Sequence, residues 1–553
     1  MKLKSFGVVP EKGDEIVVSA FKNLKERLRN YPFLLYYRPT ISIGGKRFAP
    51  DILLLHPQIG IGLINVRWWD KNFLSRVFWN NNGKMVVDGE AFPNPLDEEG
   101  ETIRELVALF KGKYNINYFL YLPNLTKSEY ENLYTFRSKV GEERIFFKYD
   151  KELKDKLLRG SGLTTIPLAT PKEFDEIREK IFPYLQLRTG GVLDLHQEEF
   201  VHNIGSGIRI LRGAAGTGKT AVLSAKAQYE STIRNRRVVV FTFIKPLLQD
   251  FRRRLDDGVE CQLIDTFIKN HYPQYNFANL AIAVEKIEIP EEEKYDVVIC
   301  DEVQDFKQPY FKLLKKLIKK EGLLLFGVDE TQRIYPWSDW NWKEVGINAK
   351  GRVTILRKSY RNPSRIVEIG VKFLQQDPVL IRELKELDAL DVGEVGFHRE
   401  GGKLICVSDA LLGQFVKHYK PEETFILVPT PVELERYGKI LQEAKVKTTI
   451  FRGEMDLDQI QPGHYILTTF RSAKGMERKN VVVVINDEVM EKHILTKKDE
   501  RLWRKAIYVA ITRAKENILI VGSGKFYNEL VNIKMEMEER ELLIEKRKKK
   551  NKG

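Results

Sequence analysis

The sequence has little cysteine, no long apolar run and no internal repeat. Its three cysteines, Cys261, Cys300 and Cys406, lie far apart, which excludes a disulfide framework or a zinc motif. Runs of about eighteen apolar residues, which a membrane-spanning helix requires, do not occur. Charged residues stand among the first few positions, before the apolar core of a secretion signal could form. These absences predict a cytoplasmic protein without a membrane partner.

The composition is typical of a multidomain globular protein with a basic excess. Apolar residues make up 43% and charged residues 30% of the chain, so hydrophobic cores can form. At about 150 residues per domain, the length predicts three or four globular units. Lysine and arginine exceed aspartate and glutamate by 91 − 77 = 14. Part of this excess forms a basic C-terminal tail, and it is compatible with a polyanionic partner or with a role in solubility alone.

Short apolar segments alternate with helical patterns along most of the chain, which predicts an α/β fold. Two series of buried strands favour two tandem parallel-sheet domains, preceded by a small α/β domain. The strands are expected at 238–243, 297–300 and 323–328, and then at 424–428, 465–468, 481–485 and 517–521. The predicted parts are an N-terminal domain (1–125), a connector (126–190), a first sheet domain (191–350), a second sheet domain (351–530), and a helix with a basic tail (531–553).

A glycine-rich loop stands between a predicted strand and a predicted helix. It matches the pattern GxxxxGK[ST] in the strand–loop–helix context that phosphate binding needs. Small residues allow backbone N–H groups to surround phosphates, and the helix N-terminus adds positive charge. Lys219 would contact the terminal phosphates, and the Thr220 hydroxyl would reach Mg²⁺. The loop comprises Gly213, Ala214, Ala215, Gly216, Thr217, Gly218, Lys219 and Thr220.

A pair of acids follows the strand expected at 296–300, which lies 301 − 219 = 82 residues beyond the loop lysine. Asp301, at the end of a buried strand, would bind the magnesium ion. Glu302 would orient and deprotonate the attacking water. Together with the loop, these acids predict a nucleoside triphosphatase that uses Mg²⁺.

Six short motifs follow one another along the chain: Leu193–Gln197, Asp301–Asp305, Val328–Tyr335, Ser359–Asn362, Thr468–Glu477 and Tyr508–Lys515. Their order is that of the UvrD/Rep-like superfamily-one helicases, which the chain resembles over about residues 191–525. The resemblance implies two RecA-like domains with ATP bound between them. It also implies roles for single residues: Gln197 reads adenine, Tyr360 stacks on it, Gln332 senses the γ-phosphate, Arg361 and Arg513 act as arginine fingers, and Gly475 and Glu477 bind ATP.

The same resemblance predicts a nucleic-acid partner, most readily single-stranded DNA. The candidate contact residues are Thr242, Phe243, Lys245, Thr266, Phe267, Tyr335, Trp337 and Thr468. Core packing is an open alternative for Phe243 and Phe267, and a solvated surface position is one for Lys245. Arg361 and Thr468 are only 468 − 361 = 107 residues apart, which leaves little room for large inserted domains. The sequence therefore favours movement along nucleic acid over strand separation.

Residues 10–125 resemble the nuclease-related (NERD) domain, which has a PD-(D/E)xK site. Asp51 and Glu15 match its acids, but Asn65 stands at a second acid position and Arg67 at the lysine position. A neutral amide offsets the dehydration of Mg²⁺ less well than a carboxylate does. We therefore expect impaired cleavage, with retained nuclease activity as the alternative.

Three functional hypotheses follow. The first is an ATP-dependent DNA helicase or translocase fused to a nuclease-like domain with a degenerate site, resembling DNA-repair or phage-defence proteins. The second is an ATP-gated, metal-dependent nuclease. The third is a non-catalytic nucleic-acid sensor that uses ATP as a switch.

Overall fold

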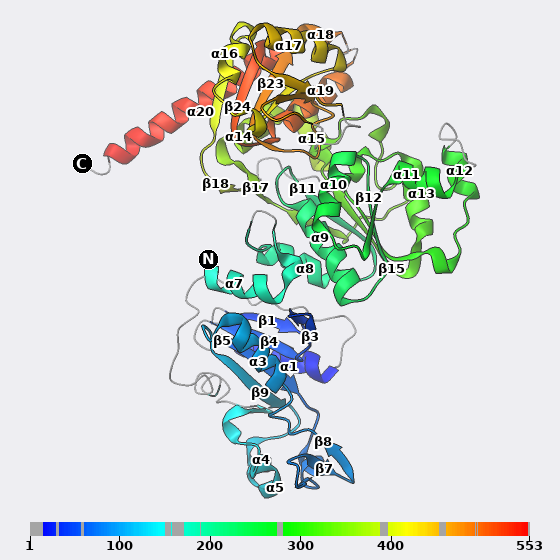
Figure 1. Ribbon diagram of the computed structural model, residues 1–553, viewed down its shortest axis with the longest axis vertical. Helices are drawn as coiled ribbons and strands as arrows, with labels where there is room; N and C mark the ends of the chain where they lie inside the picture. The colour runs from blue at the N-terminus through cyan, green and yellow to red at the C-terminus, as the bar shows by residue number, and fades with distance from the viewer. Residues whose placement is uncertain are drawn as a thin grey trace. The chain divides into compact units, whose positions relative to one another are not determined.

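The structure is a computed structural model in which the chain forms two compact units, Met1–Ile204 and Gly205–Gly553 (Figure 1). It describes residues 15–28, 33–56, 60–149, 156, 171–187, 190–273, 280–386, 396–452, 460–492, 494 and 496–550. None of the described helices combines the length and the apolar content needed to cross a bilayer.

The first unit contains a mixed five-stranded sheet in the order β1-β4-β5-β9-β10. β1, β4 and β5 pair antiparallel, whereas β9 pairs parallel with both β5 and β10. The strands of the first unit, which include those of two smaller sheets, are β1 (Leu34–Tyr37), β2 (Ile41–Ile43), β3 (Lys46–Phe48), β4 (Ile52–His56), β5 (Gly60–Val66), β6 (Phe78–Trp79), β7 (Met85–Val87), β8 (Glu90–Phe92), β9 (Ile116–Leu122) and β10 (Ile145–Phe147). Its helices are α1 (Glu15–Arg27), α2 (Lys71–Leu74), α3 (Gly100–Phe110), α4 (Lys127–Glu131), α5 (Tyr134–Arg137), η1 (Glu142–Arg144), α7 (Pro171–Ile181), η2 (Pro183–Leu185) and α8 (Leu195–Asn203).

Each face of this sheet carries its own core because successive strand side chains point to opposite faces. On one face, Phe21 and Leu24 of α1 pack with Ile52 of β4. On the other face, Leu120 of β9 packs with the short strands and small helices that follow the sheet. A buried ion pair, Arg178 Nε to Glu198 Oε2 at 2.8 Å, joins α7 to α8 within this unit.

The second unit contains two six-stranded sheets in which every pairing is parallel, so the predicted α/β class with two parallel-sheet domains is confirmed. The first sheet has the order β13-β12-β14-β15-β11-β16, and the second has the order β19-β24-β23-β20-β22-β21. The strands are β11 (Gly207–Gly213), β12 (Val238–Thr242), β13 (Val259–Leu263), β14 (Tyr295–Cys300), β15 (Ile318–Val328), β16 (Val353–Leu356), β17 (Lys358–Pro363), β18 (Gly396–Arg399), β19 (Lys403–Val407), β20 (Thr424–Val428), β21 (Thr448–Ile450), β22 (Tyr465–Thr469), β23 (Arg478–Asn486) and β24 (Ala514–Ser523).

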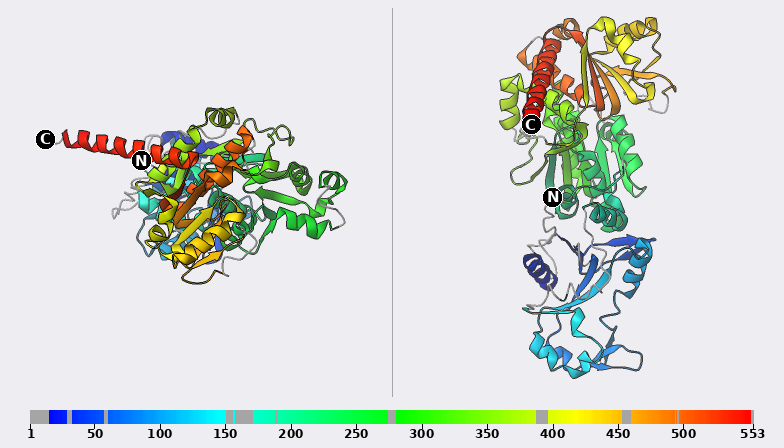
Figure 2. Two further views of the ribbon diagram at one scale, coloured as in Figure 1. Left: turned by 90° about the horizontal axis from the view of Figure 1, so that it is seen from above. Right: turned by 90° about the vertical axis from the view of Figure 1, so that its left-hand side faces the viewer.

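Helices cover both sheets, as Figures 1 and 2 show. Burial on both faces explains why strands such as β12 are continuous runs of apolar and β-branched residues. The helices of this unit are α9 (Lys219–Gln228), η3 (Tyr229–Ile233), α10 (Lys245–Arg254), α11 (Ile264–His271), α12 (Leu280–Lys286), η5 (Glu291–Glu293), η6 (Val303–Asp305), α13 (Gln308–Leu317), η7 (Glu330–Gln332), η8 (Pro336–Ser338), α14 (Ser364–Gln375), α15 (Pro378–Glu386), η10 (Asp409–Leu411), α16 (Leu412–Val416), η11 (Pro421–Glu423), α17 (Pro431–Glu443), α18 (Asp487–Glu491), α19 (Lys497–Ile511) and α20 (Lys525–Lys550).

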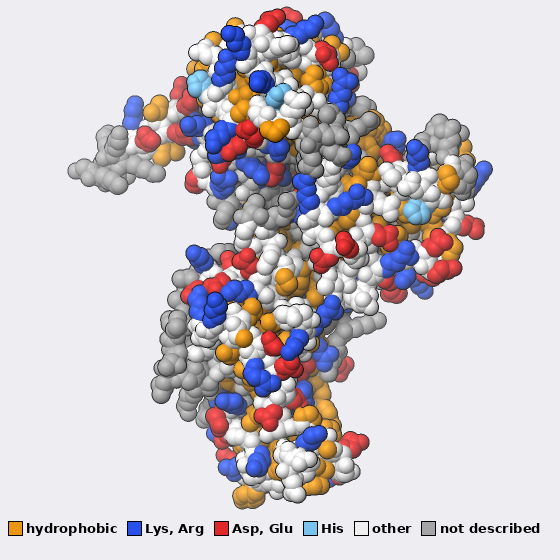
Figure 3. Space-filling view, in the orientation of Figure 1, with side chains coloured by type: hydrophobic (Ala, Val, Ile, Leu, Met, Phe, Trp, Pro, Cys, Tyr) orange, Lys and Arg blue, Asp and Glu red, His pale blue; other side chains and the backbone are white. Residues whose placement is uncertain are grey.

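The predicted domain boundaries at 125, 190, 350 and 530 stay predictions. Residues 145–147 form a strand of the N-terminal sheet, so this sheet uses chain beyond position 125. On the face shown in Figure 3, basic and acidic side chains are interspersed over both units. The basic excess therefore does not mark out a single charged patch on that face.

Candidate active site

The glycine-rich loop joins the end of β11 to the first residue of α9, as its pattern predicts. Gly216 and Gly218 have φ angles of 76° and 87°, a region that L-residues with a side chain rarely adopt. A Cβ on Gly216 would also lie 2.7 Å from Ser359 Oγ. The backbone N–H of Tyr360 donates to Gly216 O at 2.8 Å. The loop is therefore packed directly against the segment that carries the Ser359–Asn362 motif.

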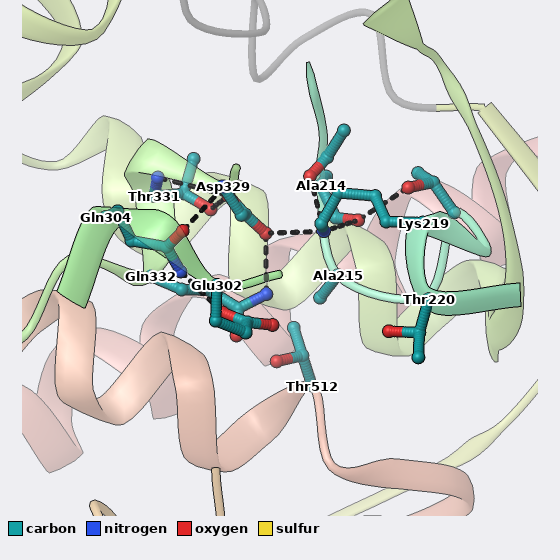
Figure 4. A network of polar contacts seen from close by, with 12 residues as sticks. Ala214, Ala215, Lys219, Thr220, Glu302, Gln304, Asp329, Thr331, Gln332 and Thr512 are labelled. Carbon is teal, nitrogen blue, oxygen red and sulfur yellow. Dashed lines mark hydrogen bonds and ion pairs between the residues drawn. The ribbon is translucent and has the colours of Figure 1, made fainter. Parts of the chain in front are cut away.

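The two loop residues with predicted phosphate and metal roles point to different partners. Lys219 Nζ donates to Gly213 O at 2.7 Å and lies 3.6 Å from Asp329 Oδ2, a contact that Figure 4 shows. Thr220 Oγ1 donates to Asp301 Oδ2 at 2.7 Å. A hydroxyl and a carboxylate at this distance are oxygen donors of the type that Mg²⁺ prefers. Burial and the neighbouring Glu302 raise the pKa of Asp301 to about 6.

Glu302 follows β14 with a φ of 54°, a left-handed conformation that is uncommon outside glycine. Its side chain is 8% exposed and accepts a hydrogen bond from Gln304 Nε2. Burial alone would raise the pKa of this carboxyl, but the charges of Lys474, Lys219 and Arg513 lower it overall. Glu302 is therefore a buried carboxylate that can accept a hydrogen bond from a water molecule.

Arg513, which directly precedes β24 of the second sheet, reaches residues that follow β15 of the first sheet. Arg513, which is 2% exposed, donates from Nη2 to Gln332 Oε1 at 3.0 Å. Gln332 in turn donates to Asp329, the same carboxylate that faces Lys219. Burial and the nearby Arg361 lower the pKa of Arg513 to about 10.

Arg361 and Glu477 form an ion pair in this structure, with Nε 2.5 Å from Oε2. Lys515 pairs with the same carboxylate. Burial opposes ionisation of Glu477, yet the charges of Arg361 and Lys515 lower its pKa to about 2. Arg361, one of the two predicted arginine fingers, is thus held at Glu477, which belongs with Gly475 to the predicted ATP-binding set.

Lys474 is a site residue that sequence reasoning missed. It is 0% exposed, and its Nζ donates to Gln332 O at 2.7 Å and to Asp305 Oδ2. The same Nζ lies 3.5 Å from Glu302 Oε2. Lys474 belongs to the second-sheet segment that follows β22, so one buried ammonium ties this segment to two of the three acids of the Asp301–Asp305 motif.

We expect Lys474→Met to reduce the kcat of ATP hydrolysis by about 10²-fold while KM stays close to the wild-type value. The substitution removes a positioning charge beside Glu302 but leaves the phosphate loop intact. It also removes the buried ion-pair partner of Glu302 and Asp305, so the free energy of unfolding should fall by about 3–5 kcal/mol. Steady-state ATPase kinetics and thermal unfolding measure the two effects.

Lys474→Arg should restore part of the lost kcat because it keeps the charge. Lys479→Met is the matched control, since Lys479 is 44% exposed and pairs with surface acids. A tenfold rise in KM with unchanged kcat would contradict a positioning role.

Three of the predicted nucleic-acid contacts form an aromatic cluster. The rings of Tyr335 and Trp337 stack with centroids 4.7 Å apart, and Phe243 lies 5.8 Å from Tyr335 and 6.3 Å from Trp337. Trp337 is 45% exposed, and its Nε1 donates to Asp305 O at 3.0 Å. The exposed Trp337 ring is therefore hydrogen-bonded to the backbone of the Asp301–Asp305 motif.

The other predicted contacts lie elsewhere. Phe267 is 2% exposed and packs between Phe241 and His271, which favours its alternative, core packing. Thr242 and Thr468 are fully buried, and Thr468 Oγ1 donates to Phe451 O. Their side chains do not reach the surface in this structure. Thr266 is exposed and Lys245 is half-buried.

Gln197 lies in the first unit, where it completes the N-terminal cap of α8. Its N–H donates to Asp194 Oδ1 at 2.9 Å and its Oε1 accepts from Asp194 N at 3.1 Å. The predicted adenine contacts of Gln197 and Tyr360 stay predictions.

The predicted N-terminal site residues fall into two groups. Asp51, Asn65 and Arg67 lie within one set of hydrogen bonds, which also includes Glu98 and Glu99. Glu15 begins α1 with an exposed side chain. Of the adjacent tryptophans, Trp68 is 52% exposed and Trp69 is 5% exposed in the core.

Comparison with protein families agrees with this geometry. The model of the AAA domain family matches residues 197–337, which hold the phosphate loop, the acidic pair and Gln332. A domain of this type is typical of UvrD/Rep-like helicases and indicates an ATP-dependent enzyme that acts on nucleic acid. No curated protein matches the chain.

Proposed function

We propose that the chain is a DNA-stimulated ATPase of superfamily-one type that moves along single-stranded DNA. One observation carries the proposal: Arg513 and Lys474, on the side of the second sheet, contact Gln332, Asp305 and Glu302, on the side of the first sheet. An ATPase that hydrolyses only when two domains meet needs such contacts beside its phosphate loop.

The charges of the site residues support a separate role for each of them in ATP hydrolysis. Lys219 and the loop N–H groups would bind the phosphates, and Thr220 with Asp301 would hold Mg²⁺, which offsets the charge on the phosphate oxygens. Glu302 would orient the attacking water. Arg513 would neutralise charge that develops on the γ-phosphate, an effect worth about 10³–10⁵ in rate in other systems.

Movement along a strand would follow from this dependence on both domains. If γ-phosphate stabilises the approach of the arginines, its release weakens the contacts between the two sheets. A strand held by both domains would then advance with each cycle of hydrolysis. Translocation is favoured over strand separation because the short spacing of the motifs in the sequence leaves little room for large inserted domains.

The aromatic cluster of Phe243, Tyr335 and Trp337 would hold the bases. We expect Trp337→Ala to raise the Kd for single-stranded DNA by roughly 5- to 150-fold, because stacking is worth about 1–3 kcal/mol per base. Fluorescence anisotropy with a labelled oligonucleotide measures this change. Trp337→Phe keeps a ring and should retain most of the affinity, whereas equal Kd values for all three proteins would contradict the role.

The test of the function is the ATPase rate with single-stranded DNA, duplex DNA and RNA. We expect single-stranded DNA to increase kcat strongly and Lys219→Ala to abolish turnover under every condition. Tight DNA binding without any increase in turnover would instead favour the sensor hypothesis.

For the N-terminal domain we propose a nuclease-like fold with a degenerate site. Asn65 and Arg67, at positions where this domain type has an acid and a lysine, support that proposal. A setting in DNA repair or phage defence is proposed from the resemblance alone.

A further inference from the structure

The polar cluster of the N-terminal unit lies where β4 begins and β5 ends. Ile52 pairs with Ile64 across these antiparallel strands, which brings Asp51 beside Asn65. The N–H of Asp51 donates to Asn65 Oδ1 at 3.3 Å, and the N–H of Val66 donates to Asp51 Oδ2 at 2.8 Å. The backbone of β5 therefore orients the Asp51 carboxylate, and the backbone of Asp51 orients the Asn65 amide.

Two further acids enter the cluster from the segment before α3. Asn65 Nδ2 donates to Glu98 Oε2 at 3.2 Å and to Glu99 Oε1 at 3.1 Å. Glu99 Oε2 accepts from Thr102 Oγ1 at 2.6 Å. The Asn65 amide thus gives both of its donors to carboxylates at a position where a carboxylate would repel them.

Arg67 lies between the two most accessible acids. Its Nη1 is 3.1 Å from Asp51 Oδ2, and its Nη2 pairs with Glu98 Oε2. Burial disfavours the charged guanidinium, but the attraction of Glu98 and Asp51 raises the pKa of Arg67 overall. Arg38 adds a second positive charge, with Nε 3.4 Å from Asp51 Oδ1.

This arrangement does not fit a divalent cation. Mg²⁺ requires several oxygens at about 2.0–2.1 Å around one point. Here Asp51 Oδ2 and Glu98 Oε2 face the two ends of one planar guanidinium, which cannot lose its proton in the accessible pH range. In the part of the chain that the structure describes, no group of three or more His, Cys, Asp or Glu side chains could hold a metal ion.

We propose that Arg67 takes the place of a divalent cation in the N-terminal unit. Its guanidinium is the built-in counter-ion of Asp51 and Glu98, so this cluster binds neither Mg²⁺ nor Mn²⁺. The described part of the unit then has no metal-dependent nuclease site, which argues against the hypothesis of an ATP-gated nuclease. The proposal does not rest on the ATPase function of the second unit, and either can fail without the other.

Mn²⁺ binding to the nucleotide-free full chain tests the proposal, with free Mn²⁺ measured by electron paramagnetic resonance. Wild type and Glu98→Gln should bind the same amount of Mn²⁺, because Glu98 is not a metal ligand. Arg67→Gln should bind about one additional Mn²⁺ per chain, since it frees the carboxylate oxygens. Adding Glu98→Gln to that variant should remove the gain.

Arg76→Gln is the matched control, because Arg76 is 52% exposed and pairs with Asp88 outside this cluster, so this variant should bind no additional Mn²⁺. Lower Mn²⁺ binding by Glu98→Gln than by wild type would overturn the proposal, and so would a folded Arg67→Gln chain without additional Mn²⁺. Circular dichroism reports whether Arg67→Gln folds. If it does not fold, the comparison of wild type with Glu98→Gln decides alone.

Discussion

Arg513→Ala is expected to bind ATP and to hydrolyse it about 10³- to 10⁵-fold more slowly than the wild type. Arg513 belongs to the side of the second sheet, and its guanidinium reaches Gln332 on the side of the first sheet. The loop that would bind the phosphates belongs to the first sheet. Removal of the guanidinium should therefore spare binding and affect the step in which charge develops on the γ-phosphate. Phosphate release at saturating ATP and single-stranded DNA measures the rate, and a fluorescent ATP analogue measures binding.

Arg452→Ala is the control for this variant. Arg452 also lies on the side of the second sheet, but it is 69% exposed and pairs only with Glu435 among the described contacts. The Arg452→Ala variant should hydrolyse ATP at the wild-type rate. An Arg513→Ala protein that turns over at the wild-type rate would show that the second sheet does not assist hydrolysis.

Glu302→Gln is expected to lower turnover by about 10²- to 10⁴-fold while ATP affinity changes little. Glutamine has nearly the same shape as glutamate, but it lacks the charge that accepts a proton from the attacking water. Glu302 is 8% exposed, and its carboxylate faces Lys474 from the second sheet. ATP should therefore accumulate on the variant, which a filter-binding assay with labelled ATP detects.

Glu321→Gln provides the matched control, because Glu321 is an exposed residue of β15 in the same sheet. It should leave the rate unchanged. If Glu302→Gln hydrolyses ATP as fast as Glu321→Gln does, Glu302 does not activate the water.

The interior parallel strands and the phosphate loop were predictable because their signals are local. A strand segment buried on both faces is continuously apolar, as residues 238–241 of β12 and 481–485 of β23 are. The edge strands β13 and β21 carry half-buried polar residues, so no such run marks them. The meeting of Thr220 with Asp301 was also predictable, because parallel strands present their carboxyl ends at one edge.

The rest of the site depends on contacts between distant segments. Lys474 meets Asp305 across 169 residues of chain, and nothing in its local sequence marks a buried ion pair. Glu98 and Glu99 precede a helix, where acids are common without any special role. Phe267 has the residue type of a base-stacking side chain, but only the packing of α11 shows that it faces the core.

A crystal structure of the chain with a non-hydrolysable ATP analogue, Mg²⁺ and single-stranded DNA tests the central claim most directly. We expect the triphosphate on the 213–220 loop, with Arg513 and Arg361 within hydrogen-bonding distance of the γ-phosphate and Glu302 facing a water molecule. A nucleotide-bound structure in which both guanidinium groups point into bulk solvent would contradict it.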